Sequence, residues 1–468
     1  MNRRQFIGGA AAFAAFGQDA FAGAGEPLLK LGMLSDVHLL TRETGKGLQN
    51  CLCFEPALRY FDARKADGVL ICGDLTDFGT TVAFKRFVGI WNMVFPGNRR
   101  SDGEPIKPLF IFGDHDMGGY MYKLPFAKSH CVVPGELDDI FCEGDVGKLW
   151  DLCFHEKWAP IQVKELKGYK FILAHHPRHT PESDNGNSIP GLAEFMAKEP
   201  IDPTKPFFFV QHRVFKDTVS VPGARCYESG KTTAILKKYP NAIAVCGHGH
   251  LNAADDLNLW QGEFTAIEVP SINYCQTRKG RENGYVNSDV PGLVMPKANI
   301  RKSWQGMFGT MYADRFVVER RDFLNEAPLG PNWVIPLPSP DGSASAKARA
   351  AKAVPPQFPA GAKITVRELK AKNREGQTTE QVYVSFPVAN STAKTPRAYD
   401  YEVLAIRDGK PFIRKQVYSR GQFWTESKDT SPVDCAFAKT ELPADWKTAV
   451  KFAAAPRDSF GNRGKAIS

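Results

Sequence analysis

The chain has 468 residues, of which 43% are hydrophobic and 24% charged, and its formal net charge is +9. These values are ordinary for a globular protein, and the length is sufficient for two or three domains. The basic excess is modest and forms no long Lys/Arg run, so the composition does not indicate a dedicated nucleic-acid-binding protein.

The N-terminus is typical of a bacterial export signal. Arg3-Arg4 precede an apolar stretch rich in Ala and Phe, which ends in the cleavage-site pattern Ala20-Phe21-Ala22. Because Gln5-Phe6-Ile7 follow the arginine pair, we favour the twin-arginine form; a general secretory signal with two incidental arginines is the alternative. We therefore expect residues 1–22 to be removed and the mature protein to be exported, to the periplasm. No later run reaches the ~18 apolar residues that a membrane span needs.

Four short apolar runs, each typical of a buried strand, end in Asp or His residues. These ends are Asp36-Val37-His38, Gly73-Asp74, Gly113-Asp114-His115-Asp116 and Gly247-His248-Gly249-His250. Helices are predicted at Phe54–Lys65 and Thr81–Val94, between the first three runs. This alternation predicts an α/β domain over residues 27–324, in which the strand ends meet at one edge of a sheet.

Two further strands, Tyr169–Ala174 and Pro206–Gln211, also end in histidine, at His175-His176 and at His212-Arg213. The intervening segments 117–165 and 270–312 are predicted to be loops and short helices around a pocket. The candidate lining residues in these segments are Tyr120, Tyr122, Arg278 and Arg281.

The C-terminal part differs in composition. Residues 325–362 are rich in Pro, Ala, Ser and Gly and predict a linker, whereas residues 363–468 contain alternating strands that predict a small β-sandwich. The turn Asp458–Asn462 resembles the last hairpin turn of fibronectin type III domains. A carbohydrate- or surface-binding role for this domain, with Trp424 as a contact, is an alternative.

The ten cysteines do not define a disulfide pattern. Cys72 and Cys246 fall within predicted buried strands, where a free cysteine behaves as a small hydrophobic residue. Bridges among the other eight are compatible with export to an oxidising compartment.

The residues at the strand ends are a metal-ligand set. Residues i and i+2 of a strand face the same side, so an Asp-x-His pair can point at one ion. Imidazole nitrogen suits Zn, Mn, Fe or Co better than Ca or Mg. Two ions ~3.5–4 Å apart, which one carboxylate can bridge, activate a bridging water as hydroxide. They also bind the attacking and leaving oxygens of an in-line displacement, and this chemistry fits hydrolysis of a phosphate ester.

The ordered motifs resemble those of the calcineurin-like metallophosphoesterase superfamily over about residues 28–320. The resemblance implies an α/β sandwich of two mixed sheets flanked by helices, and two metal ions that are Mn, Fe or Zn. It implies that Asp36, His38 and His250 bind the first ion, Asp74 bridges, and Asp114, His212 and His248 bind the second. It also implies that His115 contacts the phosphate or protonates the leaving oxygen, and that Asp116 orients His115.

Two positions depart from the family's pattern. Asp114 replaces an Asn, and three carboxylates with a hydroxide would neutralise two divalent ions. We expect this charge to favour phosphodiesters over dianionic monoesters, or to select a metal pair with a trivalent ion. Arg213 replaces a His and could hold the substrate phosphate, with a surface salt bridge as the alternative.

Two alternatives remain. The cluster of His175, His176 and His179 competes with His212 as a source of the ligand. We favour His212 because its distance to Gly247-His248-Gly249-His250, with one helix between, fits the pattern of the family that the chain resembles. A catalytically weak or inactive binding protein of the cell envelope on the same fold is the alternative function.

Overall fold

The computed structural model describes residues 25–40, 46–117, 146–177, 180–221, 223–278, 303–372, 377–389, 397–419 and 431–468. Several predictions therefore fall outside the described residues: the export signal at residues 1–22, and Tyr120, Tyr122, His179, Arg281 and Trp424. Among the described helices, none is both long and apolar enough to cross a membrane.

The first sheet has the strand order β12–β11–β10–β1–β2–β3, and β13 also pairs with β11. The bounds are β1 Leu29–Leu34, β2 Gly68–Ile71, β3 Lys107–Phe110, β10 Gln305–Met311, β11 Arg315–Asp322, β12 Ala327–Pro328 and β13 Trp333–Pro336. Strands β1, β2 and β3 are parallel, whereas β10 is antiparallel to β1 and to β11. The sheet is therefore mixed.

The second sheet has the order β4–β5–β6–β7–β9–β8. The bounds are β4 Ile161–Leu166, β5 Tyr169–Ala174, β6 Phe207–Val210, β7 Ala242–Cys246, β8 Leu259–Gln261 and β9 Thr265–Glu268. The four strands β5, β6, β7 and β9 run parallel, and the edge strands β4 and β8 are antiparallel to their neighbours. This sheet is also mixed.

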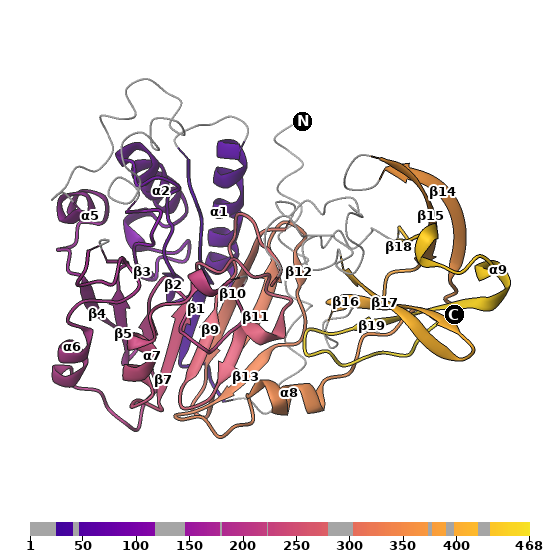
Figure 1. Ribbon diagram of the computed structural model, residues 1–468. Helices are drawn as coiled ribbons and strands as arrows, with labels where there is room; N and C mark the ends of the chain where they lie inside the picture. The colour runs from indigo at the N-terminus through magenta and orange to yellow at the C-terminus, as the bar shows by residue number, and fades with distance from the viewer. Residues whose placement is uncertain are drawn as a thin grey trace.

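The two sheets pack face to face between two layers of helices (Figure 1). One core cluster joins the inner faces, with Met33 and Leu109 from the first sheet and Phe208 and Val245 from the second. Helices α1 (Lys46–Ala63), α2 (Thr81–Val94) and α5 (Val146–Phe154) cover the outer face of the first sheet, and α6 (Leu192–Lys198) and α7 (Lys231–Leu236) cover that of the second. The predicted α/β sandwich of two mixed sheets flanked by helices is confirmed.

Helix α2 shows how the sequence produces this packing. Its N-cap is Thr80, whose side chain accepts a hydrogen bond from the Ala83 amide at 3.2 Å. Phe84, Phe87 and Trp91 recur at helical spacing and are buried against the first sheet. The aromatic stripe is therefore part of the core.

Several elements differ from the prediction. Helix α1 begins at Lys46 rather than Phe54. Strand β4 begins within the segment 117–165 and β10 lies in the segment 270–312, both of which were expected to be loops and short helices. Strand β10 is hidden because it contains Gly306 and Gly309, which have low β-propensity. A Cβ at these positions would approach the Leu34 side chain to 2.7 Å and the Phe316 ring to 2.3 Å, so packing requires the glycines.

The segment 325–362, expected to be a linker, contains ordered elements. Besides β12 and β13 it includes helix α8 (Ala346–Lys352), capped by the Ser345 side chain. Trp333 and Ile335 of β13 are 2% and 1% exposed and belong to the core between the two sheets. The Pro- and Ala-rich composition concealed a strand of the first sheet.

The C-terminal region forms two three-stranded antiparallel sheets, β14–β15–β18 and β17–β16–β19. The bounds are β14 Thr365–Lys372, β15 Thr378–Phe386, β16 Asp400–Arg407, β17 Lys410–Tyr418, β18 Val433–Ala438, β19 Val450–Arg457 and α9 Trp446–Ala449. Short 3-10 helices lie at Pro96–Asn98, Ala224–Cys226, Asp256–Asn258 and Lys439–Glu441. Both sheets contribute to one core, for example through Val384 and Tyr401, so the region is a small β-sandwich.

Among the cysteines whose side chains the structure describes, Cys72, Cys153, Cys226, Cys246 and Cys275 are free and buried, and Cys53 and Cys435 are also buried. Within this part of the chain the thiols serve packing.

Candidate metal centre

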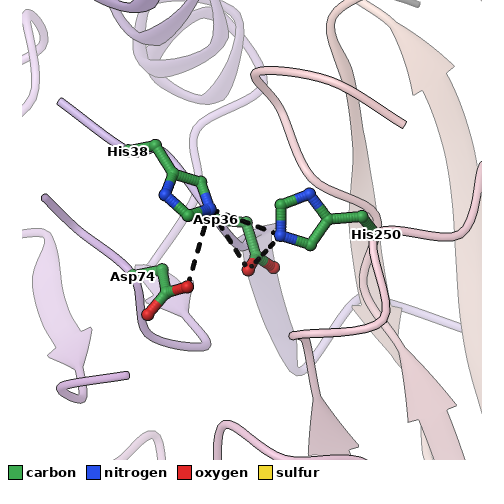
Figure 2. A group of neighbouring side chains, drawn as sticks. All are labelled: Asp36, His38, Asp74 and His250. Carbon is green, nitrogen blue, oxygen red and sulfur yellow. Dashed lines mark hydrogen bonds and ion pairs between the residues drawn. The ribbon is translucent and has the colours of Figure 1, made fainter. Parts of the chain in front are cut away.

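The seven predicted ligands meet at the carboxyl ends of β1, β2, β3, β6 and β7, in two groups that share one residue. The first group is Asp36, His38, Asp74 and His250, and the second is Asp74, Asp114, His212 and His248. Within each group the potential ligand atoms lie within 4.8 Å of one another. Figure 2 shows the side chains of the first group pointing toward one another, with Asp36 and His38 from the segment after β1, Asp74 from that after β2 and His250 from that after β7.

The first group has the spacing of atoms around one ion. His38 Nε2 lies 3.3 Å from His250 Nε2 and 3.5 Å from Asp74 Oδ2, and His250 Nε2 lies 2.9 Å from Asp36 Oδ1. Ligands at 2.0–2.2 Å from a tetrahedral ion are separated by about 3.4 Å. The distances among these atoms are therefore compatible with a single transition metal ion.

The potential ligand atoms of the second group are spaced at similar distances. His212 Nε2 lies 3.0 Å from Asp114 Oδ1, 3.3 Å from Asp74 Oδ1 and 3.2 Å from His248 Nδ1. Asp74 thus presents Oδ1 to this group and Oδ2 to the first group. This is the arrangement of a carboxylate that can bridge two ions.

Contacts at the opposite ring nitrogens fix the orientation of three histidines. His38 Nδ1 lies 2.9 Å from Asp77 Oδ1. His212 Nδ1 lies 2.6 Å from the Cys72 carbonyl oxygen, and His250 Nδ1 lies 3.2 Å from the Tyr274 carbonyl oxygen. A proton on Nδ1 leaves the Nε2 lone pair directed into the group, as a metal ligand requires.

Two buried carboxylate oxygens support the presence of a cation. Asp36 and Asp74 are 0% and 1% exposed. When His38 and His250 are neutral and carry their proton on Nδ1, neither Asp36 Oδ1 nor Asp74 Oδ2 has a hydrogen-bond donor within the described part of the chain. Because an unsatisfied buried carboxylate is costly, metal coordination would satisfy both atoms, and the donor set of carboxylate and imidazole fits Mn, Fe or Zn.

The ligand loops have strained backbones. Asp36, His38, Asp74, His248 and His250 all have positive φ, between 49° and 67°. Left-handed backbone costs about 1 kcal/mol or more for a non-glycine residue and persists where the surroundings enforce it. One such constraint is Gly247, since a Cβ there would lie 1.8 Å from Ser35 Oγ.

The carboxyl and imidazole side chains of the site also shift one another's pKa values. Burial tends to raise the pKa of the Asp36 carboxyl, but the neighbouring His250 and His38 hold that pKa well below its usual range. Burial and His115 oppose protonation of His38, yet Asp36 and Asp77 raise its pKa to about 9. Without metal the cluster therefore combines carboxylates with protonated imidazoles, so metal binding releases protons.

The predicted pairing of His115 with Asp116 is wrong. His115 Nδ1 lies 2.8 Å from the Asp77 carbonyl oxygen and 3.3 Å from the Asp77 carboxylate. Asp116 instead accepts hydrogen bonds from the amides of Leu75, Thr76 and Gly113 and from the Thr76 hydroxyl, at 2.8–3.0 Å. Asp116 therefore holds the loop that carries Asp74, and Asp77 is the carboxylate that orients His115.

Asp77 was missed although it lies three residues after Asp74 in the same loop. It also contacts His38, so that Asp77, His38 and His115 form a third group of possible ligands. Burial would raise the Asp77 pKa, but both histidines lower it far below its usual range. Its position in the sequence could have identified Asp77, because a carboxylate in the loop after β2 can reach the loops after β1 and β3.

His175 lies outside both ligand groups. Its Nδ1 accepts a hydrogen bond from the Phe112 amide at 3.0 Å, and its ring packs edge-to-face on Trp150. His176 lines a small cavity beside His212, as does Arg213. The choice of His212 over His175 therefore agrees with the geometry.

The two candidate substrate-contacting arginines differ. Arg213 donates to the Arg225 carbonyl at 2.8 Å, while its buried Nε has no acceptor among the described residues. Arg278, expected to line the pocket, instead pairs with Asp255 at 2.6 Å. Arg278 is therefore engaged in a salt bridge with Asp255, whereas the Nε–H group of Arg213 can still donate a hydrogen bond.

Comparison with known proteins gives one family match. Residues 29–252 match the family model described as calcineurin-like phosphoesterase. No curated protein sequence matches the chain. Similar solved structures include a dimetal phosphatase from Danio rerio, with 11% identity, a TM-score of 0.39 and coverage of 65% of this chain and 99% of that one. Another is a predicted phosphoesterase from Streptococcus pneumoniae, with 13% identity, a TM-score of 0.28 and coverage of 66% and 97%.

Proposed function

We propose, from the match of residues 29–252 to the calcineurin-like phosphoesterase family model, that this protein hydrolyses phosphate esters with two transition metal ions and prefers phosphodiesters to monoesters. The observation that carries the proposal is the position of Asp74, whose two carboxylate oxygens face two separate ligand groups. When bound, Mn, Fe or Zn ions at these groups supply an activated water and neutralise charge on the phosphate.

The chain's own residues supply the remaining functions. Asp36, His38 and His250 would hold the first ion, and Asp114, His212 and His248 would hold the second, with Asp74 shared by both groups. His115 is 24% exposed, so its ring can reach a bound ester, and Asp77 orients that ring. His115 therefore protonates the leaving oxygen, as a general acid does.

Arg213 is the proposed contact to a phosphate oxygen. It follows His212 directly, lines the cavity beside it and has a buried Nε without an acceptor in the described chain. An arginine can donate two parallel hydrogen bonds to a phosphate. Because Arg213 is adjacent in the chain to His212 of the second ligand group, its positive charge would favour a phosphate held at that group.

The preference for diesters follows from charge. Asp36, Asp74 and Asp114 contribute three negative charges, which leave two divalent ions with a net charge of +1 before the nucleophile is counted. A monoester is a dianion at neutral pH and depends more on net positive charge than a diester monoanion. The additional carboxylate of Asp114 therefore favours the diester.

The test is hydrolysis of a chromogenic phosphodiester and the matching monoester by chelator-treated protein supplied with Mn²⁺ or Zn²⁺. We expect turnover that depends on metal, is faster for the diester and is abolished by Asp74→Asn. Asp102→Asn, an exposed position outside the site, is the matched control and should retain activity. A protein that binds two metals without turning over either ester would instead support the inactive binding function.

We also propose export to the periplasm in the twin-arginine manner, on the basis of Arg3-Arg4 and the apolar stretch after them. Cell fractionation tests this proposal, because replacement of both arginines by lysine should retain the chain in the cytoplasm. Continued export of that variant would favour a general secretory signal.

A further inference from the structure

The segment 271–278 lies beside the first ligand group. Its first residue, Ser271, forms a parallel bridge with Ser35, and its hydroxyl donates to the Asp36 carbonyl at 2.9 Å. The Ile272 amide donates to the Ser35 carbonyl at 3.1 Å. The backbone that presents Asp36 is therefore held by this segment.

The same segment holds the loop of His250. The Tyr274 carbonyl lies 3.2 Å from His250 Nδ1, and the Tyr274 ring lies 4.5 Å from the imidazole. The Gln276 amide donates to the His250 carbonyl at 2.8 Å, and its side chain donates to the Gly249 carbonyl at 2.6 Å. Two ligands of the first group thus depend on one short stretch of chain.

The other side of this segment belongs to the C-terminal β-sandwich. Cys275 is fully buried and is part of the sandwich core, together with Phe386 and Tyr401. Cys275 is adjacent to Tyr274 in the chain. The sandwich core therefore reaches within one residue of the carbonyl that orients His250.

Arg278 makes a second connection between the two domains. Its guanidinium pairs with Asp255 at 2.6 and 2.8 Å, donates to the Ser459 carbonyl at 3.0 Å and lies 4.7 Å from the centre of the Tyr399 ring. Asp255 lies in the loop that continues from His250. One side chain thus ties both the segment 271–278 and the loop after His250 to the sandwich.

Ser459 makes the third connection. Its hydroxyl accepts a hydrogen bond from the Asp256 amide at 2.9 Å and lies 3.3 Å from the Asp256 carboxylate. Asp256 is itself held by Arg320 and by the Trp333 indole, each at 3.0 Å. The turn Asp458–Asn462 of the sandwich therefore fixes the far end of the loop that begins at His250.

We propose that the C-terminal sandwich is a positioning element of the first metal site, and that Arg278 and Ser459 are the positioning residues. This inference rests on the proposed function, because it assumes that the first group holds a metal. The physical reason is the left-handed backbone of Asp36 and His250, which persists only where neighbouring structure enforces it. Contacts made directly to metal ligands typically change metal affinity by about 10- to 100-fold, and Arg278 and Ser459 act one contact further out, through Asp255 and Asp256.

The experiment is calorimetric titration of metal-free, full-length protein with Mn²⁺ alone. His250→Ala and His248→Ala identify the binding events of the first and second sites. We expect Arg278→Met to weaken Mn²⁺ binding at the first site by about tenfold and to leave the second site within about twofold. Ser459→Ala should produce a smaller effect at the same site, and Arg278→Lys should restore part of the affinity.

The matched control is Arg367→Met, which removes an arginine of the same domain that pairs with Asp434 at 2.7 Å, away from the connection. Both Mn²⁺ affinities should be unchanged in it. If Arg278→Met does not fold, Ser459→Ala, which removes one oxygen atom, decides the question.

Two results would overturn the inference. One is unchanged affinity at the first site in the folded variants, and the other is equal weakening of both sites, which a general loss of stability would produce. A parent protein that binds no Mn²⁺ would reject the proposed function itself. A parent with two sites and unaffected variants would reject only the positioning role.

Discussion

Gly113 and Asp74 approach so closely that a Cβ on Gly113 would lie 2.2 Å from Asp74 Oδ1. The same oxygen accepts a hydrogen bond from the His115 amide at 2.9 Å. We predict that Gly113→Ala displaces the Asp74 carboxylate and abolishes binding of both metals, because this carboxylate faces both ligand groups. Metal analysis of the purified variant tests the prediction, and two retained ions per chain would contradict it.

The control for this substitution is Gly89→Ala in helix α2. A Cβ at Gly89 meets no atom within 4 Å. Since alanine is favoured over glycine in a helix by up to about 1 kcal/mol, this variant should keep its metals and should be slightly more stable than the parent.

Asp77→Asn tests which carboxylate orients His115. We predict that its kcat falls about 100-fold for esters with a poor leaving group and much less for esters with a good one, because only a poor leaving group needs a proton from His115. The rates should be measured at saturating metal, since Asp77 also contacts the ligand His38. An equal loss with both classes of ester would argue against a general-acid role.

Asp116→Asn provides the contrast. Because the Asp116 carboxylate accepts hydrogen bonds from three backbone amides, the expected effect is a loss of stability of about 1–3 kcal/mol without the leaving-group dependence. Urea unfolding of the metal-free variant measures this cost.

Asp114→Asn tests the charge argument for diester preference. Asp114 is 6% exposed, and its Oδ1 lies 3.0 Å from His212 Nε2. Removal of one negative charge should raise kcat/KM for the monoester relative to the diester, or change the metals bound, because an amide oxygen ligand is neutral. If both the ester preference and the metal content stay the same, the additional carboxylate has no role in selectivity.

Much of the fold was predictable because the strand ends carried the signal. Short apolar runs that stop at Ser-Asp, Gly-Asp or Gly-His identified β1, β2, β3 and β7, and the helix pattern identified α2. Strand β10 was missed because its glycines satisfy close packing against Leu34 and Phe316, which only the assembled sheet reveals. Strand β13 was missed because its two buried residues lie in a Pro- and Ala-rich segment.

The ligand groups were predictable for the same reason, whereas the residues that support them were not. Asp36, Asp74 and His250 stand in motifs at strand ends, where spacing suggests a role. Tyr274 and Ser271 contribute through a backbone carbonyl and one hydroxyl, in a segment without a recognisable pattern. Such contacts depend on where the chain passes in three dimensions, which local sequence does not encode.

Metal removal should destabilise the fold measurably. Ligand binding to the native state adds RT ln(1 + [L]/Kd) to stability, which is about 2.7 kcal/mol per site at a concentration 100 times Kd. We predict that Mn²⁺ raises the melting temperature of chelator-treated protein and that Asp74→Asn largely removes the increase. An equal increase in this variant would mean that Mn²⁺ stabilises the protein from another site.

His175 should make stability depend on pH. Burial, together with the nearby charge of Lys164, lowers the His175 pKa to about 3, whereas the ordinary value is 6.5. Between these values the unfolded chain binds a proton that the folded protein does not, so stability decreases as pH falls below 6.5. This difference amounts to about 2 kcal/mol between pH 8 and pH 5. In His175→Asn, where an amide oxygen can still accept from the Phe112 amide, we predict that the decrease over this range is smaller by about that amount. Urea unfolding of both proteins with chelator present measures it, and parallel pH profiles would show that His175 is not neutral in the folded state.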